Sequence, residues 1–106
     1  MAWFAVRSVY LWAQRSDGNN VFEERVVVFE APSRDEAWEK AMREAEAYRT
    51  ERREVSYVKH PDSVMYDLDL GPYEDGAEVW SEMFQSPQSL EHFYAERYEK
   101  YEYSPE

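Results

Sequence analysis

Two long hydrophobic runs dominate the beginning of the chain. Residues 3–14 (WFAVRSVYLWAQ) and 21–31 (VFEERVVVFEA) are rich in β-branched and aromatic residues, a composition typical of strands. Residues 17–20 (DGNN) lie between them and are of types that accept positive φ. The pattern therefore predicts a β-hairpin, and its second strand should end before Pro32.

A helical pattern follows this hairpin. Ser33 and Glu36 have the spacing of a capping box, in which the Ser33 hydroxyl accepts a hydrogen bond from the Glu36 amide. Small and apolar residues then recur at helical spacing along one stripe, namely Ala37, Trp38, Ala41, Met42, Ala45 and Tyr48. Acidic residues lead the segment and arginines close it, which matches the helix dipole. We predict a helix that ends near Arg53.

The second half of the chain has the same order of elements. Residues 54–62 contain Pro61 and predict a connecting loop. Residues 64–70 (VMYDLDL) and 77–84 (AEVWSEMF) alternate between apolar and polar positions, which predicts two more strands joined by a turn.

A second helix is expected after these strands. Ser86 and Pro87 resemble an N-cap followed by proline at the first helical position. Apolar and aromatic residues then share one helical face: Leu90, Phe93, Tyr94, Tyr98 and Tyr101.

The order ββαββα predicts one α+β domain spanning all 106 residues. The simplest arrangement is a four-stranded antiparallel sheet of two hairpins with two helices on one face. However, the first strand is apolar on both sides, since Trp3 and Val9 alternate with Phe4 and Val6. A sheet with one face in water should be apolar on one side. We therefore expect the 54–62 loop, the C-terminal tail, a second copy or another protein to cover the second face.

Charge is distributed unevenly along the chain. Residues 1–60 hold 11 acidic and 10 basic side chains, a net charge of −1, whereas residues 61–106 hold 12 and 2, a net charge of −10; together they give the net charge of −11. A field of this sign repels nucleic acid and anionic membranes and attracts a basic protein. The simpler interpretation is that an acidic surface keeps the protein soluble.

Sequence motifs for catalysis are missing. Without cysteine the chain has no disulfide, thiol nucleophile or thiolate metal site. His60 and His92 are not near a nucleophile motif, and we expect both at the surface. Asp67 and Asp69 could hold a hard cation from one strand face, but two acids on a solvated face have the same spacing. We predict no catalytic residue, metal or cofactor, and no enzymatic activity.

Sequence signals for a membrane span or for secretion are also missing. No run of about 18 apolar residues could span a bilayer. The N-terminus lacks the basic leader and the cleavage site of a signal peptide. We expect a cytoplasmic protein.

Several segments together resemble a known family. They are W-F-A-V-R at the start, F-E-E-R-V-V-V-F-E-A in the second strand, D-E-A-W-E-K-A in the helix and D-G-A-E-V-W-S in the fourth strand. The chain resembles the bacterial domain of unknown function 4288 over about residues 3–84. The resemblance implies a small stand-alone bacterial domain and carries no activity or functional residues with it.

The sequence supports a protein-binding module as the first hypothesis, in the concrete form of an immunity or inhibitor protein for a basic toxin. Aromatic anchors with an acidic surround would form the partner-binding surface: Asp67, Asp69, Glu78, Trp80, Glu82, Phe84 and Tyr94. Alternation in the fourth strand should place Glu78 on the same side as Trp80, Glu82 and Phe84.

Two alternatives remain open. In a homodimer, two sheets would pack face to face, with one set of residues as the shared core: Trp3, Val9, Leu11 and Trp80. A small-ligand binder would instead use the aromatic residues to line a pocket.

Overall fold

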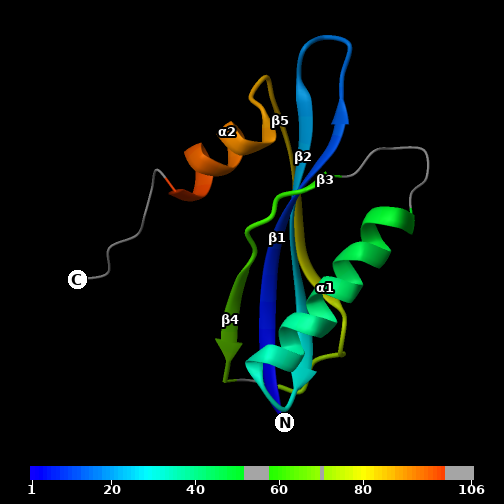
Figure 1. Ribbon diagram of the computed structural model, residues 1–106, viewed down its shortest axis with the longest axis vertical. Coiled ribbons are helices and arrows are strands. Elements are labelled where there is room, and N and C mark those ends of the chain that lie inside the picture. The colour runs from blue at the N-terminus through cyan, green and yellow to red at the C-terminus, as the bar shows by residue number, and fades with distance from the viewer. Residues whose placement is uncertain (52–57, 70, 100–106) are drawn as a thin grey trace.

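The computed structural model describes residues 1–51, 58–69 and 71–99 (Figure 1). They form a five-stranded sheet and two helices, the second of which continues into a π-helical turn. The elements in chain order are β1 (Ala2–Gln14), β2 (Asn20–Ala31), α1 (Arg34–Glu51), β3 (Val58–Lys59), β4 (Val64–Leu68), β5 (Glu78–Ser86), α2 (Leu90–Tyr94) and η1 (Ala95–Glu99).

The sheet is antiparallel, as predicted, but its topology differs from two hairpins side by side. β1 and β2 form the central hairpin, β5 pairs with β2, and β3 and β4 both pair with β1. The predicted second hairpin is therefore wrong, because β4 and β5 lie on opposite edges of the sheet. The fifth strand, β3, lies within the predicted 54–62 loop, where Val58 and Lys59 pair with Leu11 and Tyr10.

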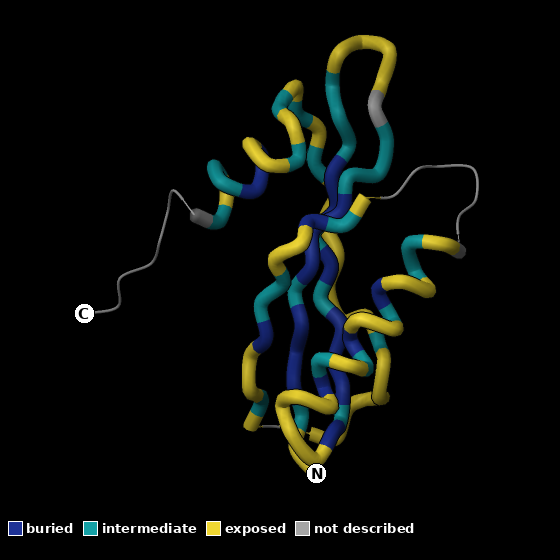
Figure 2. Tube along the Cα trace, viewed as in Figure 1, coloured by how far each residue is buried: buried dark blue, intermediate teal, exposed yellow. Residues whose placement is uncertain are grey.

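The two helices cover opposite faces of the sheet, so the prediction of both on one face is also wrong. On the first face, Phe4 and Val6 of β1 pack with Ala37 and Ala41 of α1. On the second face, Val9 packs in another cluster with residues of β2, α2 and η1: Phe22, Phe93, Tyr94 and Tyr98. Because β1 is apolar on both sides, each face needs its own cover, and α2 supplies it near Val9. Figure 2 shows buried stretches along the central strands.

α1 lies close to the sheet because its inner stripe is made of alanines. Ala37, Ala41 and Ala45 are all buried. The Glu36 amide donates to the Ser33 hydroxyl over 3.2 Å, which confirms this predicted hydrogen bond of the capping box. The predicted end of the helix near Arg53 lies outside the described residues. Within the described chain, neither helix is long and apolar enough to cross a membrane.

The second helix begins three residues later than the sequence suggested. Ser89 is its N-cap and accepts a hydrogen bond from the His92 amide. The prediction of Ser86 and Pro87 as the helix start is wrong, because Ser86 is the last residue of β5. Its hydroxyl instead accepts from the Gln88 amide and shapes the turn between strand and helix.

Candidate partner-binding surface

β5 is the edge strand of the sheet and the most exposed strand in the structure. It has nine residues, pairs with β2 on one side, and pairs with no described strand on the other. Three of its large apolar side chains are about half exposed: Val79 at 51%, Trp80 at 51% and Met83 at 49%. Exposed apolar side chains gathered on an unpaired edge are typical of an interaction surface.

Glu82 gives this edge an unpaired negative charge. It lies directly opposite Glu24 of β2, and like charges in that position repel each other. Glu24 accepts hydrogen bonds from Trp80 Nε1 at 3.1 Å and from the Tyr98 hydroxyl at 2.6 Å. Glu82 has no hydrogen-bond or ion-pair partner among the described residues, so it is free to meet a cation from outside the chain.

Tyr98 fixes the end of this arrangement from η1. Its burial raises the pKa of the hydroxyl, and the hydrogen bond to Glu24 raises it further, so Tyr98 keeps its proton and donates. Trp80 and Tyr98 thus hold the Glu24 carboxylate from two sides. The indole of Trp80 is oriented by this bond while half of the residue stays in water.

Phe84 and Tyr94, two of the predicted anchors, pack against other side chains of the fold and are less exposed than Trp80. Phe84 packs on Phe93, with ring centroids 5.5 Å apart, and the Arg97 guanidinium carbon lies 4.1 Å from the Phe84 ring centroid. Tyr94 is 5% exposed and stacks on His60 at 3.7 Å. Of these two predicted anchors, Tyr94 lies on the buried side of α2 and is part of the core.

His60 is buried, so its expected surface position is wrong. Its Nδ1 accepts from the Asp62 amide, and its Nε2 lies 2.6 Å from the Glu91 carboxylate. The first contact is local to the segment between β3 and β4, whereas the contact with Glu91 and the stacking on Tyr94 attach this segment to α2. His60 therefore helps to hold α2 on its face of the sheet.

Glu78 lies on the opposite face from Trp80, because β5 contains a bulge. Val26 pairs with Trp80 while Val27 pairs with Glu78, so Val79 is an extra residue on β5. A bulge of this kind reverses the alternation of side chains. The prediction that Glu78 shares a side with Trp80 is wrong for this reason.

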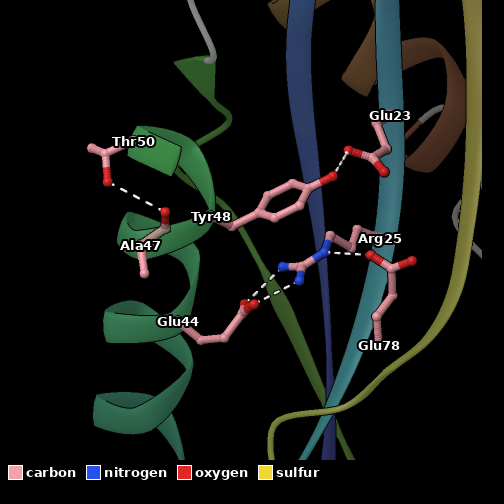
Figure 3. Close-up of polar contacts among 7 residues, drawn as sticks. All are labelled: Glu23, Arg25, Glu44, Ala47, Tyr48, Thr50 and Glu78. Carbon is pink, nitrogen blue, oxygen red and sulfur yellow. Dashed lines mark hydrogen bonds and ion pairs between the residues drawn. The ribbon is translucent and has the colours of Figure 1, made fainter. Parts of the chain in front are cut away.

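The bulge directs Glu78 to Arg25 of β2, beneath α1 (Figure 3). Arg25 Nε donates to Glu78 at 2.6 Å, and its two terminal nitrogens donate to the two oxygens of Glu44 at 2.7 and 2.6 Å. The guanidinium carbon lies 3.6 Å from the ring centroid of Tyr48, whose hydroxyl donates to Glu23. Arg25 thus joins β2, β5 and α1.

The ionisable groups of this cluster are shifted by burial and by one another. Burial lowers the pKa of Arg25, but its hydrogen bonds to Glu44 and Glu78 outweigh that effect and raise it. Burial raises the pKa of Tyr10 to about 12. Burial also raises the pKa of Glu23, although the hydrogen bond from Tyr48 acts in the opposite direction. A permanent cation held by two carboxylates is typical of a structural element of the core.

Asp67 and Asp69 lie at the other edge of the sheet, away from β5. Asp67 pairs with Phe4 and forms an ion pair with Arg34 at 2.7 Å. Asp69 follows the end of β4 and is exposed. In the described ranges, no group of three or more acidic or histidine side chains is placed to hold a metal ion.

The predicted partner-binding residues therefore fall into separate places. Trp80 and Glu82 form the exposed surface, with Phe84 partly buried beside it. Sequence reasoning missed Met83 as part of this edge, because alternation assigned it to a sheet face and not to an unpaired strand. The exposed length of β5 would have been the signal, but strand order is needed to recognise it.

Comparisons with known proteins give one match. No curated protein and no solved structure matches the chain. The model of the domain of unknown function DUF4288 matches residues 3–81, a range that includes the central hairpin, α1 and the first part of β5. The match covers most of the 106 residues, and the chain belongs to the DUF4288 family.

Proposed function

We propose that this domain is a small acidic protein-binding module whose partner presents a basic surface. An immunity or inhibitor protein bound to a basic toxin is the concrete form of this function. The observation that carries the proposal is the exposed surface of β5, where Trp80 is half exposed beside the unpaired Glu82.

Trp80 and Glu82 contribute to binding in different ways. Tryptophan is among the residues that contribute most to protein interfaces, because its large ring buries much area with few rotatable bonds. Glu82 and the net charge of −11 favour the approach of a basic partner, and complementary charge mainly increases the association rate. A lysine or arginine opposite Glu82 would also relieve its repulsion with Glu24.

The alternative, a homodimer with face-to-face sheets, has less support. Two members of the expected dimer core are already covered within the chain, because Val9 is 1% exposed and Leu11 packs against the cluster beneath α2. Trp3 packs against Tyr73, with ring centroids 5.4 Å apart. Trp80 is the one residue of that expected core that stays half exposed.

A small-ligand binder has less support again. One cavity beside Arg25 and Ser8 has a volume of about 10 Å³, and a hollow beside Met42 and Lys59 has about 150 Å³. The first has room for about one water molecule. Both are smaller than the ~300 Å³ at which typical ligand sites begin. We therefore assign no cofactor. We also propose the cytoplasm as the site of action.

Parallel capture of a partner by matched variants tests the proposal. Wild type, Trp80→Ala, Glu82→Lys and the control Glu39→Lys are immobilised at equal density and exposed to host lysate at low salt with nuclease present. Glu39 is an exposed acid on α1, so its reversal changes the net charge equally. We expect one basic protein to bind wild type and Glu39→Lys, to be released by moderate salt, and to be lost with the other two variants.

Three results would contradict the proposal. They are equal retention of the same protein by all four chains, loss of that protein with Glu39→Lys as much as with Glu82→Lys, and retention of no basic protein by wild type. The second result would mean that total charge matters and the surface of β5 does not.

A further inference from the structure

We infer that β5 binds its partner by strand addition, in which an extended basic segment of the partner pairs with the open edge of β5. The inference rests on the proposed function and specifies how that function is performed. It requires an edge with free backbone groups, a side-chain pattern that selects the incoming strand, and a reason why a second copy does not occupy it.

The backbone groups on the open edge follow from the pairing with β2. The Val28 amide donates to the Ala77 carbonyl at 3.0 Å, and the Val28 carbonyl accepts from the Gly76 amide at 2.8 Å. Val28 therefore directs both backbone groups toward the β5 side of β2, and in an antiparallel sheet every second residue of β2 does the same. The β5 partners of those residues, Trp80, Glu82 and Phe84, are bonded to β2.

The intervening residues of β5 direct their backbone groups outward. They are Ser81, Met83 and Gln85. Each presents an N–H and a C=O group to the position of a further strand, as in other proteins that bind an extended peptide at a sheet edge. β5 contains no proline and no lysine, which are two of the residues that commonly block such edges.

The other edge of the sheet is less suited to strand addition. It is made of β4, with five residues, and β3, with two, separated by the segment around His60 and Pro61. An incoming strand would meet that interruption after a few residues. β5 has its bulge at Val79, near its beginning, and runs from Trp80 to Ser86 without a further break; Figure 2 shows the first part of the strand exposed.

The side chains of β5 define the chemistry of the incoming strand. Glu82 and Trp80 project on the α2 face, whereas Met83, which pairs with Glu23, projects on the α1 face. The residue opposite Glu82 should be lysine or arginine, because it would neutralise an unpaired carboxylate and lie close to the Trp80 ring. The residue opposite Met83 should be apolar. The partner segment is therefore an alternating basic and apolar strand.

A second copy of the chain fits the edge less well. β5 carries Glu78 and Glu82 and has no basic residue. Antiparallel pairing of two β5 strands would leave Glu82 of each copy without a cation in every register. It would also bring together two chains that each carry a net charge of −11.

Binding of a defined peptide tests the inference. The probe is a fluorescent peptide of alternating lysine and valine, and its affinity is measured by anisotropy at low salt. The key variant is Met83→Pro, because proline is tolerated in an edge strand where the N–H points to solvent, yet it removes that N–H from an incoming strand. Its control is Met83→Thr, which shortens the side chain and keeps the N–H.

We expect the peptide to bind wild type, and to bind Met83→Thr within about threefold of wild type. We expect Met83→Pro to weaken binding by at least about tenfold, because it removes about one backbone hydrogen bond and disturbs the pairing around it. Slower hydrogen exchange of the Ser81, Met83 and Gln85 amides in the complex should accompany binding. If Met83→Pro does not fold, a peptide N-methylated at consecutive residues, tested on wild type, makes the same comparison and should not bind.

The other outcomes separate the two proposals. If Met83→Pro and the N-methylated peptide bind as well as their controls while Glu82→Lys binds about tenfold more weakly, strand addition is overturned and the proposed function stands. If wild type does not bind the peptide, or Glu82→Lys binds it equally, the basic-strand inference fails too, and capture by the surface variants decides the proposed function separately. A concentration-dependent dimer mass that Met83→Pro abolishes would identify a second copy as the occupant and overturn the inference.

Discussion

Replacing Arg25 with methionine should cost much more stability than replacing an exposed arginine of the same fold. Arg25 is 7% exposed and forms three hydrogen bonds with Glu44 and Glu78. Methionine has a comparable length and would fill the space beneath Tyr48, so the principal loss is electrostatic. The variant would leave two carboxylates close together with no cation between them.

The magnitude follows from how far those carboxylates can be rehydrated. Removing one partner of a buried ion pair typically costs about 3–5 kcal/mol. The side chains of Glu44 and Glu78 are 24% and 37% exposed, so water would compensate part of the loss. We therefore expect the lower end, about 3 kcal/mol. For a urea m-value of about 2 kcal/mol/M, this corresponds to a decrease of about 1.5 M in the midpoint.

Urea unfolding followed by circular dichroism measures this difference, with Arg34→Met as the matched control. Arg34 forms an ion pair with Asp67, but these side chains are 51% and 69% exposed, so its removal should cost under about 1 kcal/mol. A second variant, Arg25→Met with Glu44→Leu and Glu78→Leu, should recover most of the stability, because no uncompensated charge remains. Equal midpoints for Arg25→Met and Arg34→Met would refute the reasoning, as would a triple variant no more stable than the single one.

Three further predictions concern other parts of the fold. Glu23→Gln should be more stable than wild type at neutral pH. Burial raises the folded-state pKa of Glu23 above its ordinary value of 4.5. The protonated carboxyl therefore stabilises the fold fully below pH 4.5, and this stabilisation is lost as the pH rises through the folded-state pKa. Urea midpoints of both proteins should therefore converge in acid, and a difference that grows there would contradict the sign. Ser33→Ala should lower the unfolding free energy by about 1 kcal/mol through loss of the helix cap, whereas Ser33→Asp should retain it. Gly71→Ala would place a Cβ 2.7 Å from the Trp3 ring, so the ring must move. The near-ultraviolet circular dichroism of the tryptophans should therefore change, and an unchanged spectrum would contradict this close approach.

Local patterns predicted the elements well because each was encoded by neighbouring residues. The central hairpin, the Ser33 cap and the alanine stripe of α1 depend on spacings of a few residues, and the structure confirms them. The start of α2 was misplaced because two serines, Ser86 and Ser89, both precede helical residues. Ser86 still belongs to β5, whereas Ser89 follows the strand and caps the helix. The local pattern does not reveal where the strand ends.

The arrangement of the elements required information that local patterns lack. Whether β4 pairs with β5 or with β1 depends on the path of residues 69–77, which connect strands on opposite edges. The apolar character of both sides of β1 correctly indicated a covered second face, but several segments could have supplied the cover. The position of Glu78 depended on a single inserted residue, Val79, which leaves no mark in an alternating sequence.

The bulge at Val79 links the stability of the domain to its proposed function. Without it, Glu78 would project on the same face as Glu82, and Arg25 would lose one of its two carboxylate partners. With it, one acid of β5 is used inside the fold and the other stays unpaired at the surface. Arg25→Met should therefore change stability, whereas Glu82→Lys should change binding with little effect on the urea midpoint. If Glu82→Lys destabilised the domain as much as Arg25→Met, Glu82 would have a structural role like that of Glu78. The surface of β5 would then not be supported as a binding site.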